Sequence, residues 1–455
     1  MLIFATCIVI GGCSTKKYPS GNPSEILSSD IYNKLQRKCQ DIQNFDSGTA
    51  IVKNKLFGLI DEEGDEVLPC EYDSITELYG AYRIIKKSKK YGFVNLDGKL
   101  KGECKYHNFY HWANYPRMSY IPYIPMELNN KWGFFNIEGE AVTQFKYEEL
   151  SQVDDSAFVA KYNGLYGVSD YEGNELIPFK YEEVVYKPFK DCQISFVKQN
   201  NLYGIVNSKN KLVTDCEFSF YSYPQNGYVR LRKEDSDSYK TTKYGLVDPE
   251  TGKEIIPFGK YSNVGEYSEG LIMVEKNNKC AYVDINQKIV IPFQYCDGGD
   301  FSEGLVLVHK VVGTDYTIMG TVPLEKGGYI DKKGNVVIPF KFSLILAPSS
   351  SGFKEGLAVE GYGNHNIFAT KFGYINKRGK FVVPPIYDEA EPFEKGFGKV
   401  RLNDKIGYVN KNGELVIPCI YEDDYVLTKS DEIIGLRKDR VEYFFDYNGK
   451  KAENK

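Results

Sequence analysis

Short runs of alternating apolar and polar residues cover most of the chain, and the same order of residues returns about every 34 to 47 positions. Each run begins at an aromatic or apolar residue followed by glycine, a pair that we call the anchor. Nine copies keep the glycine: Phe57-Gly58, Tyr91-Gly92, Trp132-Gly133, Tyr166-Gly167, Tyr203-Gly204, Tyr244-Gly245, Gly327-Gly328, Phe372-Gly373 and Ile406-Gly407. Cys280-Ala281 and Glu442-Tyr443 stand at the same place in two further copies. The eleven copies, numbered in chain order, predict a tandem array over residues 46–455.

A tight turn is predicted after each anchor. The third residue after the anchor is Asp or Asn in the first ten copies: Asp61, Asn95, Asn136, Asp170, Asn207, Asp248, Asp284, Asp331, Asn376 and Asn410. Glycine follows three residues later in most copies, as at Gly64 and Gly334, whereas Asn210 takes its place once and Gly252 comes one residue late. Asp or Asn accepts hydrogen bonds from the turn backbone, and glycine supplies a positive φ. The spacing therefore predicts a strand, a turn and a returning strand.

The returning strand and the turn after it have signatures of their own. Most returning strands contain Ile-Pro-Phe or a variant, with an aromatic residue two positions later, as in Ile177–Tyr181. Because proline has no N–H to donate, this strand must end there or lie at a sheet edge. An aromatic–x–x–Gly–apolar segment, which we call the connecting turn, then leads into the next copy: Tyr267–Leu271, Phe301–Leu305, Phe353–Leu357 and Phe393–Phe397. Each copy is predicted to hold about three short strands and two turns.

One helix is expected before the repeats, over residues 24–45. Leu27, Ile31 and Leu35 recur every four residues on one face, and Ser24 is a possible N-cap. We expect this helix to cap the first copy, since terminal repeats need a cover for their apolar face.

Composition narrows the fold class to an all-β protein. The hydrophobic fraction of 42% is too high for a disordered chain, and 37 Tyr, 27 Phe, 42 Gly and 19 Pro suit strands and turns more than helices. Three strands per copy and atypical terminal copies favour an open curved array over one or two β-propellers, the alternative arrangement. The balance of 57 basic and 62 acidic residues leaves no basic field for nucleic acid.

The order of these signatures resembles the WG-repeat (WG β-repeat) family, in which Trp-Gly, an Asp, a turn glycine, an Ile-Pro pair and an aromatic–x–x–Gly segment follow one another. Trp stands in the anchor only at Trp132, and Tyr or Phe takes its place in most other copies. The resemblance implies a tandem β-array with a binding or scaffolding role. It implies no particular substrate or reaction.

The first twelve residues, MLIFATCIVIGG, read as a signal peptide. Ile10-Gly11-Gly12-Cys13 resembles the lipobox of bacterial lipoproteins, although no Lys or Arg precedes the apolar run. The resemblance implies cleavage before Cys13, a diacylglycerol on its sulfur, and a membrane-anchored lipoprotein of the cell envelope, at the outer membrane or surface. Residues 13–23 would then form a polar tether. A chance apolar start on a cytosolic protein is the alternative.

Linear motifs for chemistry are lacking, so we expect no enzyme, metal or cofactor. Cys70, Cys104, Cys216 and Cys419 occupy the returning-strand position that holds Phe in other copies, which predicts small buried hydrophobes. The sequence has no C-x-x-C pair, nucleophile elbow or phosphate loop. His107 and His111 lie in a segment rich in Tyr and Pro, and solitary His309 and His365 are expected in exposed loops. Only an active site assembled from several copies would escape this search.

Surplus aromatic residues mark the candidate binding surface. The insertion Tyr106–Met126 contains Trp112, Tyr115 and Tyr120, more aromatic residues than a solvated loop requires. We expect these three residues to bind a protein or other macromolecule. Stacking on sugars is the alternative, which would make the chain a carbohydrate-binding surface lipoprotein with an envelope polysaccharide as partner. They could also simply cover the neighbouring copy. The function expected is therefore non-enzymatic binding by an envelope-anchored β-repeat protein.

Overall fold

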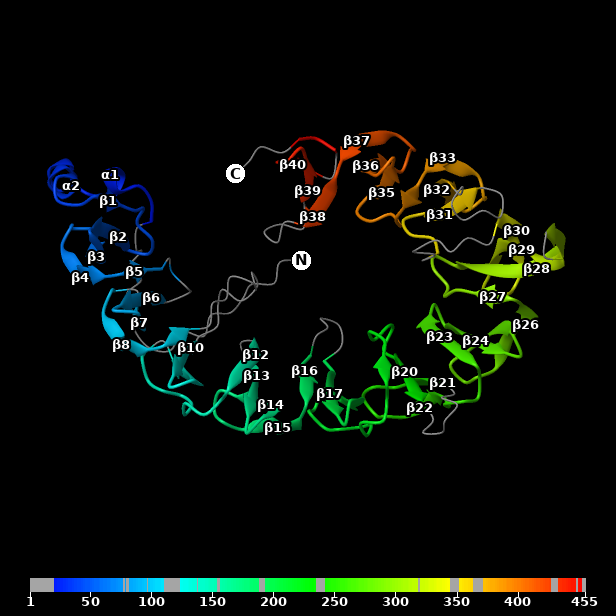
Figure 1. Cartoon of the computed structure of the whole chain (residues 1–455), viewed down its shortest axis with the longest axis horizontal. Coiled ribbons are helices and arrows are strands. Elements are labelled where there is room, and N and C mark those ends of the chain that lie inside the picture. The colour runs from blue at the N-terminus through cyan, green and yellow to red at the C-terminus, as the bar shows by residue number, and fades with distance from the viewer. Residues whose placement is uncertain are drawn as a thin grey trace, which may run out of the picture. The chain divides into compact units, whose positions relative to one another are not determined.

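The computed structural model describes residues 20–76, 78, 82–95, 97–109, 123–136, 138–153, 156–187, 193–234, 242–317, 320–343, 352–362, 371–426, 433–446 and 449–451. The chain divides into two compact units, residues 1–184 and 185–455. The described residues form eleven antiparallel sheets of three or four strands (Figure 1), one for each copy of the repeat. The prediction of an all-β tandem repeat is confirmed.

The first unit contains the sheets of copies 1 to 4. Their strands are β1 (Asp41–Ile42), β2 (Thr49–Asn54), β3 (Leu56–Asp61) and β4 (Glu66–Tyr72) in copy 1; β5 (Ser74–Ile75), β6 (Tyr82–Lys87), β7 (Lys90–Asn95) and β8 (Leu100–Tyr106) in copy 2; β9 (Asn108–Phe109), β10 (Tyr123–Leu128) and β11 (Lys131–Asn136) in copy 3; and β12 (Glu149–Val153), β13 (Ala157–Tyr162), β14 (Leu165–Asp170) and β15 (Glu175–Tyr181) in copy 4.

The second unit contains the sheets of copies 5 to 11, beginning at β16, which spans the boundary. Their strands are β16 (Glu183–Val185), β17 (Ser195–Gln199) and β18 (Leu202–Val206) in copy 5; β19 (Phe220–Tyr221), β20 (Val229–Glu234), β21 (Thr242–Val247) and β22 (Glu254–Ile256) in copy 6; β23 (Asn263–Ser268), β24 (Leu271–Lys276), β25 (Lys279–Val283) and β26 (Ile289–Tyr295) in copy 7; β27 (Asp297–Gly298), β28 (Leu305–Thr317), β29 (Gly320–Asp331) and β30 (Val336–Ser343) in copy 8; β31 (Leu357–Tyr362), β32 (Lys371–Asn376) and β33 (Phe381–Tyr387) in copy 9; β34 (Glu389–Ala390), β35 (Phe397–Leu402), β36 (Lys405–Asn410) and β37 (Leu415–Tyr421) in copy 10; and β38 (Asp423–Val426), β39 (Ile433–Lys438) and β40 (Val441–Asp446) in copy 11.

The hairpin after each anchor is built as the sequence predicts. In copy 8, the Asp331 carboxylate accepts hydrogen bonds from the backbone N–H groups of Lys333 and Asn335, at 2.9 and 2.8 Å. Gly334 then adopts a φ of 83°, which the turn requires. The returning strand β30 forms the outer edge of its sheet, so Pro339 leaves no ladder hydrogen bond unmade.

Most sheets also contain a fourth strand that the sequence patterns missed. In several copies it is only two residues long, as in β1, β5 and β27, and it pairs with the first strand of the main hairpin. So short a segment contains no detectable alternation, which is why the sequence indicated three strands instead of four.

The amino-terminal helix prediction is wrong in its extent. Two helices, α1 (Pro23–Ile26) and α2 (Ser29–Gln36), replace the single helix expected over residues 24–45, and β1 follows them. The break falls at Leu27, which has extended backbone angles and a buried side chain. Asn22, not Ser24, is the N-cap of α1, because its side chain accepts the Ser24 N–H at 2.9 Å.

In several junctions between copies, the hairpin turn of one copy lies against the returning segment of the copy before it. A Cβ on Gly252 of copy 6 would lie 2.2 Å from the carbonyl oxygen of Val213 in copy 5. A Cβ on Gly413 of copy 10 would lie 2.5 Å from that of Val382 in copy 9. At Gly252 and Gly413 the glycine is therefore required by contact between copies as well as by its φ. Before copy 1, the side chain of Ile31 in α2 takes this place against Gly64.

The cysteines of the returning strands replace phenylalanine, as the sequence predicts, but they are half-buried, not fully buried. The Sγ atom of Cys419 lies 2.6 Å from where a Cβ on the anchor Gly407 would stand, the place that Phe340 takes against Gly328 in copy 8. Burial raises the pKa of the Cys104 and Cys419 thiols. These thiols are therefore packing groups and poor nucleophiles.

Candidate binding cleft

The connecting turns of the second unit are tight hairpin turns. Ser302 and Leu305 exchange two backbone hydrogen bonds, at 2.9 and 3.2 Å. The two residues between them, Glu303 and Gly304, have φ values of 52° and 84°. Positive φ at both central positions defines a type I′ turn, which matches the twist of the flanking strands. Glu269 and Glu355 hold the place of Glu303 in the neighbouring connecting turns, with φ values of 49° and 52°.

The glutamates of these turns join successive copies. The Glu269 carboxylate accepts the Gly304 N–H with both oxygens, at 3.2 and 3.0 Å, and Glu303 accepts the Gly356 N–H at the same two distances. Glu355 accepts the Gly396 N–H at 2.9 Å. Each bond thus runs from one connecting turn to the next, and we call the series the carboxylate ladder.

A lysine from the following hairpin completes each step of the carboxylate ladder. Lys377 Nζ lies 3.0 Å from Glu303, and Lys411 Nζ lies 2.8 Å from Glu355. The hydrogen bond from Lys411 lowers the pKa of Glu355 below its ordinary value. Charged hydrogen bonds to backbone N–H groups are stronger than neutral ones, so the ladder fixes the spacing of the connecting turns.

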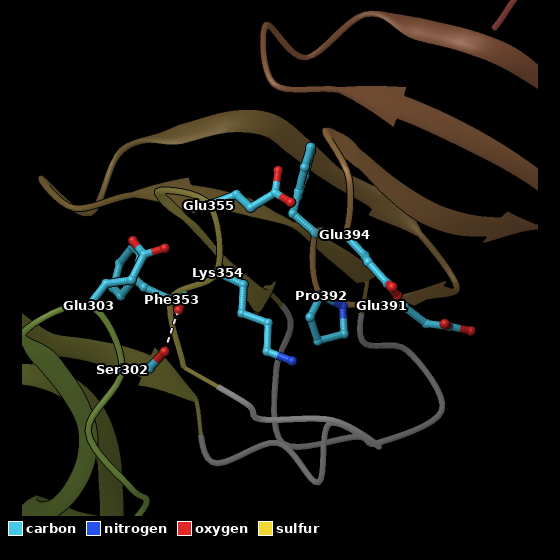
Figure 2. Close-up of a pocket in the computed structure, with 9 residues that line it drawn as sticks. Ser302, Glu303, Phe353, Lys354, Glu355, Glu391, Pro392 and Glu394 are labelled. Carbon is cyan, nitrogen blue, oxygen red and sulfur yellow. Dashed lines mark hydrogen bonds between the residues drawn. The ribbon is translucent and has the colours of Figure 1, made fainter. Parts of the chain in front are cut away.

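A cleft of about 490 Å³ opens beside three consecutive connecting turns. We call it the turn cleft. Figure 2 shows Glu303 on one side, Glu391 and Glu394 on the other, and Lys354 between them. Ser302 Oγ donates a 2.5 Å hydrogen bond to the carbonyl oxygen of Phe353, which ties two of the turns together. The cleft is lined by Ser302, Glu303, Phe353, Lys354, Glu355, Glu391, Pro392, Phe393 and Glu394.

Charge in the turn cleft is only partly neutralised within the chain. Glu391 pairs with Lys399 at 2.8 Å, and Glu303 and Glu355 belong to the carboxylate ladder. Lys354 and Glu394 are exposed, and within the described part of the chain no hydrogen bond or ion pair joins either side chain to another residue. A cleft in which one cation and one anion have no partner among the described residues is suited to bind a polar surface that carries both charges.

The polar side chains among the described lining residues are four carboxylates, one hydroxyl group and one ammonium group. Ser302 carries the only hydroxyl group of the set, and that group is committed to the Phe353 carbonyl. Among the described residues that line the cleft there is no histidine or cysteine. Across the described residues, no three His, Cys, Asp or Glu side chains come together in a way that would hold a metal ion. Side chains of both charges in one cleft could hold a polar ligand.

The structure does not test the site residues that the sequence singled out. Cys13, Trp112, Tyr115 and Tyr120 all lie outside the described residues. Tyr106 and Tyr123 flank the segment that contains the three aromatic residues, and both pack in the core. Tyr106 stacks on Phe145 with ring centres 5.7 Å apart, and Tyr123 stacks on Tyr171 at 3.8 Å.

The expectation for His309 is wrong. His309 lies in β28 and is buried, not in an exposed loop, because it faces Asp297 and Gly327 in the neighbouring strands. Burial lowers the pKa of its imidazole. His365 and His111 lie outside the described residues.

Sequence patterns do not predict the carboxylate ladder and the turn cleft, and the reason is physical. Their signal is a recurring Glu-Gly pair, at residues 269–270, 303–304 and 355–356. The glycine predicts the turn, but the glutamate predicts no contact, because its partner is a backbone N–H in another copy. Linear spacing contains no information about that contact.

Comparison with known proteins identifies the repeat. The family model described as "WG containing repeat" matches nine segments that together make up more than half of the chain: residues 57–91, 132–166, 166–203, 203–235, 244–280, 281–310, 328–359, 372–405 and 406–423. Among curated proteins, none matches the chain. The described residues include no helix long and apolar enough to cross a membrane.

Several solved structures match the chain at low identity and low TM-score. A eukaryotic initiation factor is 13% identical over 79% of this chain and 92% of that chain, with a TM-score of 0.34. The extracellular domain of a putative one-component system from B. thetaiotaomicron is 9% identical over 91% and 71%, with a TM-score of 0.23. PorZ, a surface component of the type-IX secretion system of Porphyromonas gingivalis, is 9% identical over 92% and 69%, with a TM-score of 0.20. Likeness at this level supports no functional assignment.

Proposed function

Because the chain belongs to the WG containing repeat family, we propose that it is a non-enzymatic binding protein of the bacterial envelope, which captures another protein at the turn cleft. The observation that supports this proposal most is the pair of free charges, Lys354 and Glu394, on turns whose backbone is held by the carboxylate ladder. Because the backbone of these turns is already ordered, binding costs mainly the ordering of the two side chains.

The lining of the turn cleft favours a protein over a sugar as the ligand. Sugar binding generally needs the open face of an aromatic ring, but Phe353 and Phe393 are only 0% and 2% exposed. The groups that face solvent are instead carboxylates, an ammonium group and the ring of Pro392. Such a set matches a polypeptide that presents both a basic and an acidic side chain. A glycan remains the alternative ligand, through the aromatic residues Trp112, Tyr115 and Tyr120.

The partner can be identified by photo-crosslinking in living cells. A photoreactive phenylalanine analogue is introduced at Glu394, and the control position is Glu254, an exposed residue of β22 in the same unit. We expect a crosslinked protein of defined mass at position 394 and none at position 254. Equal adducts at positions 394 and 254 would refute binding at the turn cleft. So would the absence of an adduct both at position 394 and at position 354, where the same analogue replaces Lys354. A glycan in the adduct would favour the carbohydrate alternative.

The envelope location rests on the lipobox-like residues Ile10–Cys13. If a diacylglycerol on Cys13 holds the protein to the membrane, replacing Cys13 by alanine is expected to move it from the membrane fraction to the soluble fraction, because the polar tether has little membrane affinity of its own. Fractionation followed by immunoblotting measures the change. A C7A variant is the matched control, since that cysteine lies within the apolar run. Unchanged partition of C13A would rule out the lipid anchor.

A further inference from the structure

One core position of the repeat differs in copy 9 from every other copy. In copy 9 the second anchor residue, Gly373, pairs with Glu360 on the strand before it. The other ten copies have an apolar residue there, each buried: Val52, Ile85, Met126, Ala160, Val197, Leu231, Val274, Val308, Val400 and Leu436. Glu360 is 6% exposed, so its carboxyl group lies inside the core.

The carboxyl group joins copy 9 to copy 8. The Tyr329 hydroxyl of β29 donates a 2.5 Å hydrogen bond to Glu360 Oε1. The surrounding side chains of this junction are apolar and include Leu305, Ile338 and Phe353. Removing a carboxylate from water into such surroundings is costly unless several donors replace the lost water.

Tyrosines at the position of Tyr329 in two neighbouring copies make a different bond. Tyr282 of copy 7 donates to the carbonyl oxygen of Gly299 at 3.0 Å, and Tyr374 of copy 9 donates to that of Glu391 at 2.6 Å. Both acceptors are backbone groups, which do not titrate in water. The bond from Tyr329 is therefore the titratable member of a series of otherwise similar contacts between copies.

Few groups are placed to stabilise a negative charge on the buried Glu360 carboxyl. The Gly361 N–H hydrogen-bonds to the carboxylate, and among the described residues the cation that acts on it is Lys341 of β30, whose ammonium group is committed to the Gly379 carbonyl at 2.8 Å. Tyr329 is the other titratable group that faces it, and burial raises the pKa of that hydroxyl far above its ordinary range. Burial also raises the pKa of Glu360 to about 7.

We propose that the Tyr329–Glu360 pair makes the junction between copies 8 and 9 a pH-sensitive joint, which is closed while the Glu360 carboxyl is protonated and loosens when it ionises. The joint packs against Phe353, whose connecting turn forms the middle of the turn cleft. Ionisation at this junction would thus change the spacing of the cleft's turns. The joint itself does not depend on whether the cleft binds a protein.

The sign of the effect follows from the direction of the shift. A carboxyl with a raised pKa in the folded state stabilises the junction fully below its ordinary pKa near 4.5, and this stabilisation is lost as the pH rises through about 7. Hydrogen exchange of the β31 and β32 backbone amides, corrected for intrinsic rates, measures local opening. Between pH 5 and pH 8 we expect their protection to fall roughly 10- to 100-fold in the wild-type protein.

Two variants isolate the carboxyl group. Glu360→Gln keeps the shape without titration, and Glu360→Val introduces the residue that copies 1, 5, 7, 8 and 10 carry. Both are expected to abolish the pH dependence of protection in β31 and β32. Glu266→Gln is the control, because burial raises the pKa of Glu266 to about 7 as well, but that residue lies in β23 of copy 7. It should leave the response of β31 and β32 unchanged.

The outcomes separate the proposal from its rivals. Wild-type protection that stays constant from pH 5 to pH 8 would overturn it, and so would a wild-type response in Glu360→Val or Glu360→Gln. If Glu360→Gln fails to fold, the valine variant decides alone, since other copies accommodate valine at this position. Loss of the response in the control Glu266→Gln would assign the joint to copy 7 and contradict the proposal.

Discussion

Replacing Gly252 by alanine is expected to destabilise the second unit by about 3 kcal/mol. The residue has a φ of 74°, which costs a side chain about 1 kcal/mol, and the new Cβ would lie 2.2 Å from the Val213 carbonyl oxygen in the preceding copy. A contact this short with a backbone atom forces the two copies apart, an overpacking penalty of about 1–3 kcal/mol. Urea unfolding followed by circular dichroism measures the change.

A matched control separates backbone strain from contact between copies. Gly270 of the same unit has a φ of 95°, but nothing lies within 4 Å of the position its Cβ would occupy. Gly270→Ala is therefore expected to cost only about 1 kcal/mol. Equal losses in the two variants would show that the turn glycines serve φ alone and that copies do not stack through them.

Replacing Phe158 by alanine should remove about 3–5 kcal/mol from the first unit. The ring is 0% exposed and lies in an aromatic cluster, with ring centres 4.5 Å from Phe134 and 5.0 Å from Tyr147. Truncation deletes these ring contacts and leaves a cavity that β-sheet neighbours cannot fill.

Tryptophan fluorescence reports this loss selectively. The chain has 2 Trp residues, Trp112 and Trp132, and both belong to the first unit. Trp132 packs against the same aromatic cluster as Phe158. Leu165→Ala, in the adjacent strand β14, is the control, since Leu165 is 38% exposed and its loss should cost within about 0.5 kcal/mol. An unfolding midpoint that is the same in F158A and L165A would contradict a tightly packed core in copy 4.

Local turn chemistry explains how much of the fold the sequence predicts. Asp331 and Gly334 specify a hairpin through groups within five residues, and Pro339 places its strand at an edge without reference to any other copy. Eleven repetitions of such short-range rules are enough to predict the all-β array. The break at Leu27 was missed because a periodic apolar pattern does not reveal where a buried side chain requires extended backbone.

Contacts between copies explain why the site was missed. Glu303 and Gly356 are 53 positions apart, and their bond exists only because two connecting turns lie side by side. Thr143 shows the same limitation within a copy: its hydroxyl accepts the Phe134 N–H at 2.9 Å, at the position where copies 4 and 8 have Ile177 and Ile338, a role that its sequence position does not reveal. Glu360, by contrast, stands out from the sequence once the copies are placed in register.

The central claim is that Lys354 and Glu394 bind a protein partner, and the affinity of the crosslinked partner tests it most directly. The variant K354A/E394A removes both free charges and leaves the net charge unchanged, and K253A/E254A is the equivalent control on β22 and its turn. By isothermal titration calorimetry, we expect K354A/E394A to raise the Kd at least tenfold, about 1.4 kcal/mol, and K253A/E254A to leave it unchanged. Equal Kd values for the wild-type protein and K354A/E394A would contradict the claim.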